Sequence, residues 1–580
     1  MHKAKNLSAL VVTLIFALCL VGTAMAGPGS VEVTVPGDIT LKMGAQVRFI
    51  PTSEIDRDFG LSDGLNSTQE TKAATGMYDL GNYSHSTRAH LTEGAGAVKD
   101  NYVRNENRLF FNFAHEQDWD VYMMLEMDTL WDASGVDTTD FAWGRQSQQF
   151  GIERLNASFN IPALSSRLRG GWDARGVDIA FGGFTYADDD PGLGLVGEAD
   201  GWKWEAWWIK KQENEAGYGD DRTYIDPDNP SDYDSDLYDY MTQVNPIGPP
   251  SQEKDADRDL YYAKLGYGPG STYVEAFYMF HRNRVDATGT LREFRGYDSA
   301  TKTTDFDIDH HVVALQAKGT YGILKPMFEV AHAFGDYETT IDLILDGTSV
   351  PTTAYDHDIK SWAAFGDVAL DLHEAVGIKK FEPHVGFYYL QGDDDALDDD
   401  LEGWAPVTGI SRFTPRFGSE QSICHDGNAL FGQIEYSMFP AYYGRVRGAG
   451  INGNNAYDNP GFTMIGGGLQ AAWDNWSYKG NVMAMWFNEE SAVEAFYTLD
   501  LKVPDVKIDE FMGVEWNNEL SYKLYDQVTL KLGVALLFPG DGAEDITQAL
   551  DAYARDVDFS EGKASDKISQ RYAAEILWFF

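Results

Sequence analysis

The last nine residues of the chain, Tyr572 to Phe580, constrain its fold more than any other stretch. In a β-strand successive side chains point to opposite faces. One face here is apolar and aromatic, made by Tyr572, Ala574, Ile576, Trp578 and Phe580, while Arg571, Ala573 and Glu575 form a partly polar face. Chain termini usually fray into water, so this end needs an apolar environment. The buried edge of a soluble sheet offers one, and the lipid around a transmembrane β-barrel offers the other.

The first 26 residues have the three parts of a secretory signal peptide. Lys3 and Lys5 give a basic start, residues 7–20 an apolar run, and Ala24-Met25-Ala26 a small-residue cleavage site. We expect cleavage before Gly27 and a single domain over residues 27–580. No apolar run long enough for a membrane-spanning helix occurs in the sequence, which excludes a helical inner-membrane protein. After cleavage Cys424 is the only cysteine, so no internal disulfide is expected.

The composition favours one large sheet over several soluble domains. The chain has 31 Tyr, 32 Phe, 15 Trp and 58 Gly but only 20 Pro in 580 residues, as many strands with aromatic girdles and turns require. The formal net charge of −46 argues against binding to nucleic acid or to anionic lipid by charge. Most of the acidic residues fall in expected loops, for example residues 213–239 and 393–402, where charge runs are solvated.

The first strand after the signal, over residues 38–50, alternates cleanly between apolar and polar side chains. Periodicity alone fits both a soluble sandwich and a barrel, but the connections distinguish them. Tight turns, for example at residues 116–118 and 268–270, alternate with connections too long for an ordinary compact domain. The expected long connections are residues 51–101, 211–257, 286–305, 335–359, 392–460, 488–510 and 539–566. Short turns at one end and long loops at the other are typical of a transmembrane barrel.

This scheme predicts an antiparallel up-and-down β-barrel with short periplasmic turns and long extracellular loops. It has eighteen strands, and sixteen is the alternative because residues 167–184 and 193–199 give the weakest pattern. Residues 429–438 resemble a strand but are assigned to a loop. Charged residues on inward faces, such as Glu126, favour a water-filled interior. The strands are expected near residues 38–50, 101–115, 119–131, 148–161, 167–184, 193–199, 202–211, 258–267, 272–284, 306–318, 323–334, 358–372, 381–391, 461–473, 476–487, 511–524, 527–538 and 568–580.

Two stretches carry a resemblance to a known family. One is the aromatic C-terminal strand. The other is a block with a basic strand at residues 167–175, the acidic-Pro-Gly segment 188–195 and the aromatic segment 201–210. The chain resembles the Gram-negative outer-membrane porin superfamily, and most of all the alginate-export-like porins. The resemblance implies that Tyr572, Ile576, Trp578 and Phe580 form the signal that the β-barrel assembly machinery reads, and that the basic strand and acidic loop lie along the pore. Many such porins are homotrimers and some large barrels are monomers, so the oligomeric state stays open.

The basic strand supplies candidate selectivity residues. Alternation places Arg167, Arg169, Asp173 and Arg175 on one face. We expect these arginines to face Asp188, Asp189 and Asp190 across a constriction, where opposite charges create a transverse field. The alternative is structural ion pairs beside an acidic surface loop. Further candidates for the lumen wall are Arg48, Arg104, Arg108, Glu126, Arg154, Arg282 and Arg284.

No catalytic, phosphate-binding or complete metal motif is present, and no cofactor is expected. Asp232, Asp234 and Asp236 alternate like the start of a calcium loop but lack its glycine and distal glutamate, so a loop-bound divalent cation is a minor alternative. His310 and His311 point to opposite faces of a strand and cannot share a metal.

The sequence therefore predicts an outer-membrane porin that passes ions and small hydrophilic solutes passively and is not an enzyme. A channel specific for an oligosaccharide or organic acid, and a structural or enzymatic outer-membrane barrel, are the alternatives. The expected partners are membrane lipid, lipopolysaccharide bridged through divalent cations, the assembly machinery and small solutes, with no nucleic acid.

Overall fold

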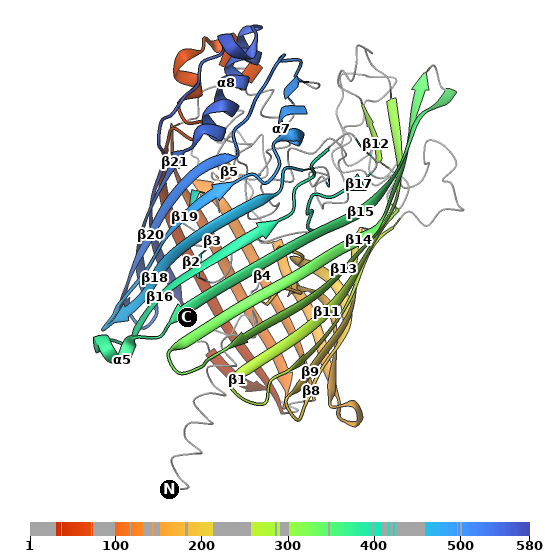
Figure 1. Cartoon of the computed structure of the whole chain (residues 1–580). Helices are drawn as coiled ribbons and strands as arrows, with labels where there is room; N and C mark the ends of the chain where they lie inside the picture. The colour runs from red at the N-terminus through yellow and green to blue at the C-terminus, as the bar shows by residue number, and fades with distance from the viewer. Residues whose placement is uncertain are drawn as a thin grey trace, which may run out of the picture.

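In the computed structural model, eighteen antiparallel strands form one closed β-barrel, as the alternation predicts (Figure 1). The barrel closes where β2 pairs with β22. The eighteen strands are β2 (Ile39–Ile55), β3 (Lys99–His115), β4 (Trp119–Trp131), β6 (Gly151–Ile161), β7 (Ser166–Gly176), β8 (Ala187–Ala199), β9 (Trp202–Gln212), β10 (Arg258–Tyr267), β11 (Thr272–Asn283), β13 (Thr301–Gly319), β14 (Leu324–Leu345), β15 (Thr348–Leu370), β16 (Lys380–Leu390), β18 (Phe462–Trp473), β19 (Trp476–Trp486), β20 (Phe511–Tyr525), β21 (Val528–Pro539) and β22 (Ser569–Phe579).

The structure describes residues 31–73, 99–131, 142–143, 151–212, 257–290, 301–407, 416–417, 422–423 and 457–580, with gaps of one to four residues inside several of these ranges. The expected signal peptide (1–26), the acidic run Asp232–Asp236 and residues 429–438 lie outside the described residues. The remaining described elements are β1 (Val31–Val35), β5 (Ala142–Trp143), β12 (Ala287–Thr290), β17 (Asp400–Leu401), α5 (His373–Val376), α7 (Ser491–Ala495), α8 (Asp541–Arg555), η1 (Leu61–Gly64), η2 (Pro162–Leu164) and η5 (Phe559–Glu561).

The two ends of the barrel differ in their connections. At one end, which we call the turn end, neighbouring strands are joined by short turns, and the C-terminus lies there too (Figure 1). The turn between β8 and β9 is Asp200-Gly201, with φ of 51° and 84°, the positive values that a tight hairpin turn needs. Nearly all the long connections emerge at the opposite end, the loop end.

The outward face of the wall is apolar. Side chains at alternate positions, among them Leu193, Leu315, Val385 and Ile465, are more than 45% exposed. A closed sheet with such a belt of exposed apolar side chains fits a lipid environment. In the described part of the chain, no helix has both the length and the apolar character needed to cross a bilayer.

Several predicted boundaries are wrong, although the predicted strand number is confirmed. The strand expected at residues 167–184 ends at Gly176, and the strand expected at 193–199 begins at Ala187. The expected long connection 335–359 is mostly strand, because β14 and β15 run for 22 and 23 residues and are separated by only two. The expected loops 488–510 and 539–566 contain α7 and α8.

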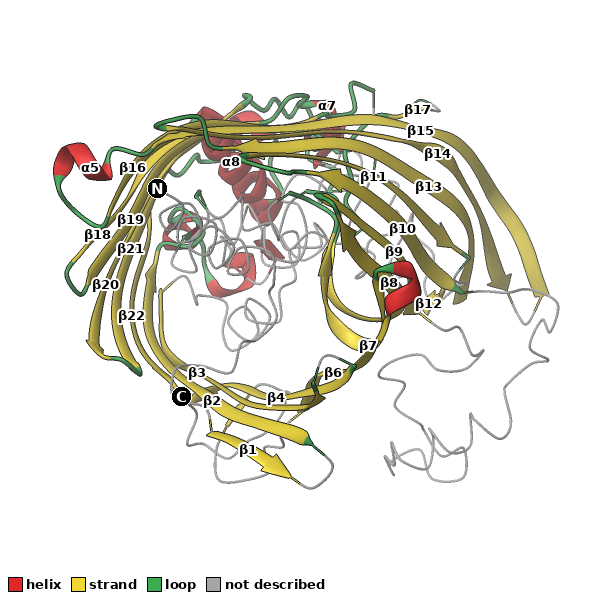
Figure 2. Cartoon of the chain, turned by 90° about the horizontal axis from the view of Figure 1, so that it is seen from below, coloured by secondary structure: helices red, strands yellow, loops and turns green. Residues whose placement is uncertain are grey.

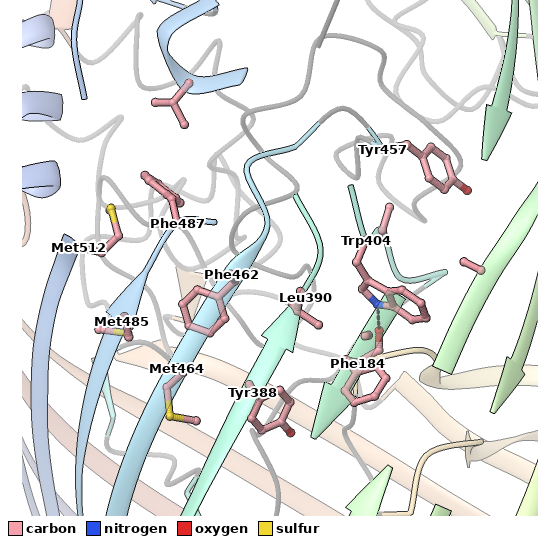
Figure 3. Packing of buried hydrophobic residues seen from close by; sticks show 14 of the residues in the cluster. Phe184, Tyr388, Leu390, Trp404, Tyr457, Phe462, Met464, Met485, Phe487 and Met512 are labelled. Atoms are coloured by element: carbon pink, nitrogen blue, oxygen red, sulfur yellow. Dashed lines mark hydrogen bonds between the residues drawn. The ribbon is translucent and has the colours of Figure 1, made fainter. Parts of the chain in front are cut away.

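The barrel interior is packed along one part of the wall. The described residues of two segments, 177–179 with 184–186 and 391–395 with 398 and 400–407, lie against inward side chains of β10 to β16. The first segment connects β7 to β8 and the second follows β16. The Trp404 indole donates to the Phe184 carbonyl at 2.7 Å, and the Val407 amide donates to the Thr185 carbonyl at 3.1 Å (Figure 3). We call these two segments together the inner plug. The expectation of a uniformly water-filled interior is therefore corrected: buried aromatic side chains fill this part.

At the loop end, the segment that follows the first barrel strand contacts the segment that precedes the last one. Residues 56–65, which follow β2, pack against α8 and the residues before β22. α8 lies above the rim at β20 and β21 (Figure 1) and projects over the interior when the barrel is seen along its axis (Figure 2). We call this contact the seam clasp.

Candidate functional site

Arg48 is the centre of an ion-pair cluster where the first and last barrel strands meet. It lies on β2, opposite Glu106 of β3. Its Nη1 donates to Glu106 Oε2 at 2.7 Å and its Nε donates to Glu575 Oε1 of β22 at 3.0 Å. Lys531 Nζ lies 3.1 Å from the other Glu575 oxygen. The side chains of Arg48, Glu106 and Glu575 are buried. Ion pairing and hydrogen bonding reduce the cost of burying their charges.

The cluster continues around the wall through Arg108. This guanidinium contacts Glu106 on its own strand, Glu126 on β4 and Glu153 on β6. The Nε–Glu153 Oε2 distance is 2.9 Å. Arg104 Nη2 also lies 3.5 Å from Glu106 Oε2. Arginines of β2 and β3 are thus paired with glutamates of β3, β4, β6 and β22.

A β-bulge brings two neighbouring residues of β6 into this network. Met124 of β4 opposes Arg154, whereas Leu125 opposes Ile152, so Glu153 is the extra residue. A bulge interrupts the strict alternation of faces. Glu153 can therefore contact Arg108 while Arg154 Nη2 lies 3.3 Å from Asp189 Oδ1 on β8.

A second group of charges lies nearer the turn end. Arg167 of β7 contacts Asp120 of β4 and Ser158 of β6, and its Nη1 donates to Asn160 Oδ1 at 3.3 Å. Arg169 is more loosely held, with its Nη2 3.7 Å from Asp173 Oδ2.

The expected opposition of arginines and acids across a constriction is corrected. Asp188, Asp189 and Asp190 belong to β8, which pairs directly with β7, so Arg175 opposes Asp188 within one ladder. Lys211 of β9 holds two of these acids, at 3.0 Å from Asp188 Oδ2 and in a shorter contact with Asp190. The acids and the basic strand are lateral neighbours in the wall.

Arg175 does not bind these carboxylates. Its guanidinium donates to the backbone carbonyls of Gly171 at 2.8 Å and Asp173 at 3.1 Å, and also to that of Asp190. It lies over the Trp207 ring, 4.4 Å from the centroid, which is a cation–π contact. Arg175 is therefore a structural residue of the wall.

The inward side chains divide into an accessible and a covered set. We define the charged strip as Arg48, Arg104, Glu106, Arg108, Asp120, Glu126, Glu153, Arg154, Arg167, Arg169 and Asp173, on strands β2 to β7. Side chains along it are accessible from the interior: Arg104 is 40% exposed, Arg169 28% and Arg167 27%. On the covered wall, His281, Gln316 and Glu329 are at most 1% exposed. Water can therefore reach the three arginines Arg104, Arg167 and Arg169 of the charged strip, whereas Arg48 and Glu106 near the closure are buried.

One predicted lumen residue lies outside the barrel. Arg282 follows the inward His281 on β11, and its Nη1 lies 3.9 Å from Asp259 Oδ2, beside the outward Tyr261. Arg284 contacts Asp307 at 2.8 Å and Asp309 at 2.7 Å. Period two places Arg282 with the outward Tyr278 on β11, so the expectation that Arg282 lines the lumen is wrong.

Several residues of the network were not anticipated from the sequence. Glu106 occupies the same alternation as Arg104 and Arg108, so period two could have identified it. Glu575 was assigned to the polar face of the last strand without a partner. The inward position of Glu153 depends on the β-bulge, and the contacts of Lys211 depend on the pairing between β8 and β9. Neither feature leaves a local signal in the sequence.

The C-terminal residues lie as the alternation predicts. Tyr572 and Ile576 are outward and exposed, while Arg571 and Glu575 are inward and buried. Trp578 packs edge-on against Phe49 with ring centroids 5.6 Å apart. Among the described residues, no group of three or more His, Cys, Asp or Glu side chains could hold a metal ion.

Comparisons with known proteins give structural likeness only. No family model and no curated protein matches the chain. Solved structures with similar folds include Acinetobacter baumannii OccAB2 (10% identity, TM-score 0.40, covering 92% of this chain and 97% of that one). A BenF-like porin from Pseudomonas fluorescens Pf-5 is 8% identical with a TM-score of 0.40, covering 94% and 99%. OmpT of Vibrio cholerae is 9% identical with a TM-score of 0.30, covering 95% and 100%. At these identities the likeness extends to the barrel fold alone.

Proposed function

We propose that this chain is a Gram-negative outer-membrane porin that passes ions and small hydrophilic solutes by passive diffusion. The observation that supports it is the charged strip: accessible, ion-paired side chains extend from Asp120 and Arg167 near the turn end to Arg104 near the loop end. Accessible charges inside an apolar-walled barrel require water. On this proposal the turn end is periplasmic, and the apolar belt contacts lipid and lipopolysaccharide.

The paired charges of both signs in the strip suit this role. An anion meets arginines along the strip and a cation meets carboxylates. Neither solute has to break an ion pair of the strip to pass. The inner plug leaves the strip as the accessible side of the lumen, so selectivity depends on the strip's looser charges. Arg169 is the best example, because Asp173 is its only close acidic partner among the described residues.

The test is conductance of the purified protein in planar bilayers, with reversal potentials in a salt gradient. The wild type is expected to give discrete steps. Arg169→Gln removes one accessible positive charge and is expected to shift the reversal potential toward cation preference. Arg282→Gln, which removes an outward arginine, is the matched control and should leave the reversal potential unchanged.

Absence of steps from the folded protein would contradict the porin proposal and favour a structural or enzymatic barrel. Equal shifts in the two variants would show that solutes do not follow the strip. Saturation of the ion current by one oligosaccharide or organic acid would favour the substrate-specific channel.

A further inference from the structure

Three basic or imidazole side chains meet on the covered wall near the loop end. Arg258 of β10, His281 of β11 and His310 of β13 are 5%, 0% and 1% exposed. Arg258 Nε donates to His281 Nε2 at 3.1 Å. His281 and His310 are directly opposite in the ladder, with ring centroids 6.4 Å apart. We call these residues the basic cluster.

The hydrogen bonds of this cluster are incomplete. Among the described residues, Arg258 Nη2, His281 Nδ1 and both ring nitrogens of His310 have no hydrogen-bond partner. Buried polar groups are nearly always paired, and leaving one unpaired is unfavourable. Four such nitrogens in three adjacent residues indicate a missing partner.

The charge of Arg258 is also uncompensated. In the described part of the chain, no carboxylate oxygen lies within 4.0 Å of its guanidinium, whereas the equally buried Arg48 has two carboxylates. Asp188 and Asp190, on the neighbouring part of the wall, are bound by Lys211. A buried guanidinium without a counter-charge is strongly unfavourable.

Three of these four unpaired nitrogens are donors when both histidines are neutral. Because Arg258 donates to His281 Nε2, a neutral His281 carries its proton on Nδ1. Arg258 Nη2 is a donor in every state, and a neutral His310 offers one N–H. Three buried donors around one positive charge match an acceptor-rich anion and not a metal ion.

An aromatic ring and apolar side chains border the basic cluster. Tyr457 packs edge-on against His310, with ring centroids 5.4 Å apart. The neighbouring inward residues Leu260 and Met279 are fully buried.

We propose that the basic cluster binds a small oxyanion. The guanidinium supplies charge and a directional N–H pair, as it does for carboxylate and phosphate oxygens, and the two imidazoles complete the set of donors. Because the site lies on the covered wall and not along the charged strip, the anion is a resident ligand that joins β10, β11 and β13, separate from the proposed solute path.

The test is equilibrium dialysis of the purified full-length protein in detergent with labelled sulfate or labelled acetate. We expect saturable binding of one anion per chain. Arg258→Met and His310→Phe should each weaken binding by about tenfold or more, which corresponds to about 1.4 kcal/mol. Arg282→Met, the neighbouring outward arginine, should bind like the wild type. Sulfate binding would indicate a tetrahedral ligand, and acetate binding a carboxylate.

Absence of saturable binding of both anions to the folded wild type would overturn the proposal. So would an equal loss of binding in the Arg282 variant. His310→Phe keeps an aromatic ring against Tyr457, so it tests the site even if Arg258→Met does not fold. The binding measurement needs no conductance, and its outcome is independent of the porin proposal.

Discussion

Glu106 receives contacts from four side chains: Gln46, Arg48, Arg104 and Arg108. Its side chain is 2% exposed, so its charge offsets the buried Arg48. Glu106→Gln keeps the shape but removes that charge and turns one acceptor into a donor. We expect a loss of about 2–4 kcal/mol in the free energy of unfolding, measured by urea titration of the refolded barrel in vesicles. Glu198→Gln, whose side chain is 77% exposed, is the control; equal losses would contradict a central role for Glu106.

Asp371 predicts a dependence of stability on pH at the turn end. Burial acts to raise the pKa of Asp371, but hydrogen bonds from Lys325 and His373 outweigh it and lower the pKa to about 2. The Lys325 Nζ–Asp371 Oδ2 distance is 2.7 Å. An unfolded aspartate has a pKa of about 3.9. The stabilisation is therefore complete above the unfolded value and is lost as the pH falls through about 2.

Asp371→Asn should remove this contribution. Between pH 5 and pH 2, the unfolding midpoint of the wild type is expected to fall further than that of the variant. Glu374→Gln, an exposed change three residues along, should behave like the wild type. Parallel curves for wild type and Asp371→Asn would show that Asp371 makes no such contribution.

The sequence predicted which face of a strand a residue occupies better than it predicted the residue's partner. Alternation placed Arg48, Arg108 and Glu126 on inward faces, because period two is a property of a single strand. Their partners come from neighbouring strands, and register is set by the pairing of whole hairpins. The opposition between Arg167 and the acids of β8 was wrong for this reason, since a shift of the strand start from 193 to 187 moved Asp188 from a loop into the ladder.

At the scale of elements, the seam clasp joins segments more than 480 residues apart in the chain. Phe59 is fully buried, and its carbonyl accepts hydrogen bonds from Ser565 Oγ at 2.7 Å and from the Lys567 amide at 3.0 Å. Arg555 Nη2 donates to the Gly64 carbonyl at 2.7 Å. Gly60 has a φ of 86°, and a Cβ there would lie 2.5 Å from Lys567 Cδ, so the turn requires glycine.

Phe59→Ala should open the clasp without unfolding the barrel. Truncation of a buried Phe costs about 3–5 kcal/mol, and elements outside the sheet can unfold locally. We expect faster hydrogen exchange of α8 amides by mass spectrometry, with exchange in β2 and β22 unchanged. Val376→Ala, at the exposed α5 on the other end, is the control. Unchanged exchange in α8 would contradict the clasp, and faster exchange in the strands would show that it holds the barrel closed.

The strands were more predictable than the connections between them. Each strand carries its own alternation, so eighteen could be counted one at a time. Residues 335–359 were assigned to a connection, but β14 and β15 extend through them as a paired ladder. α8 has an amphipathic pattern, yet its apolar side chains pack against loops, which strand periodicity does not address.

For the whole molecule, the sequence indicated a closed barrel but not how its interior is divided. Inward charged residues such as Glu126 suggested a water-filled interior. The inner plug instead covers Gln316 and Glu329: Gln316 Nε2 donates to the Val177 carbonyl, and Glu329 Oε2 accepts from the Ile179 amide, both at 2.9 Å. These bonds join residues about 140 to 150 positions apart, and such contacts cannot be read from local patterns.

The inner plug gives a prediction for the molecule as a whole. Trp404 is 1% exposed and joins the plug's two segments through the Phe184 carbonyl and through the Phe184 ring, 5.6 Å away (Figure 3). Trp404→Ala removes both contacts, at a cost of about 3–5 kcal/mol, and leaves the strand ladders intact. If the plug narrows the water-filled lumen, single-channel conductance should rise and its noise increase.

Trp362→Ala is the matched control, because this tryptophan is 49% exposed on the outward face of β15. It should leave the conductance unchanged. Both variants must first show the folded, heat-modifiable form on gels, which separates a loosened plug from a collapsed barrel. A folded Trp404 variant with wild-type conductance would show that solutes never meet the plug, and that the charged strip alone sets the size of the path.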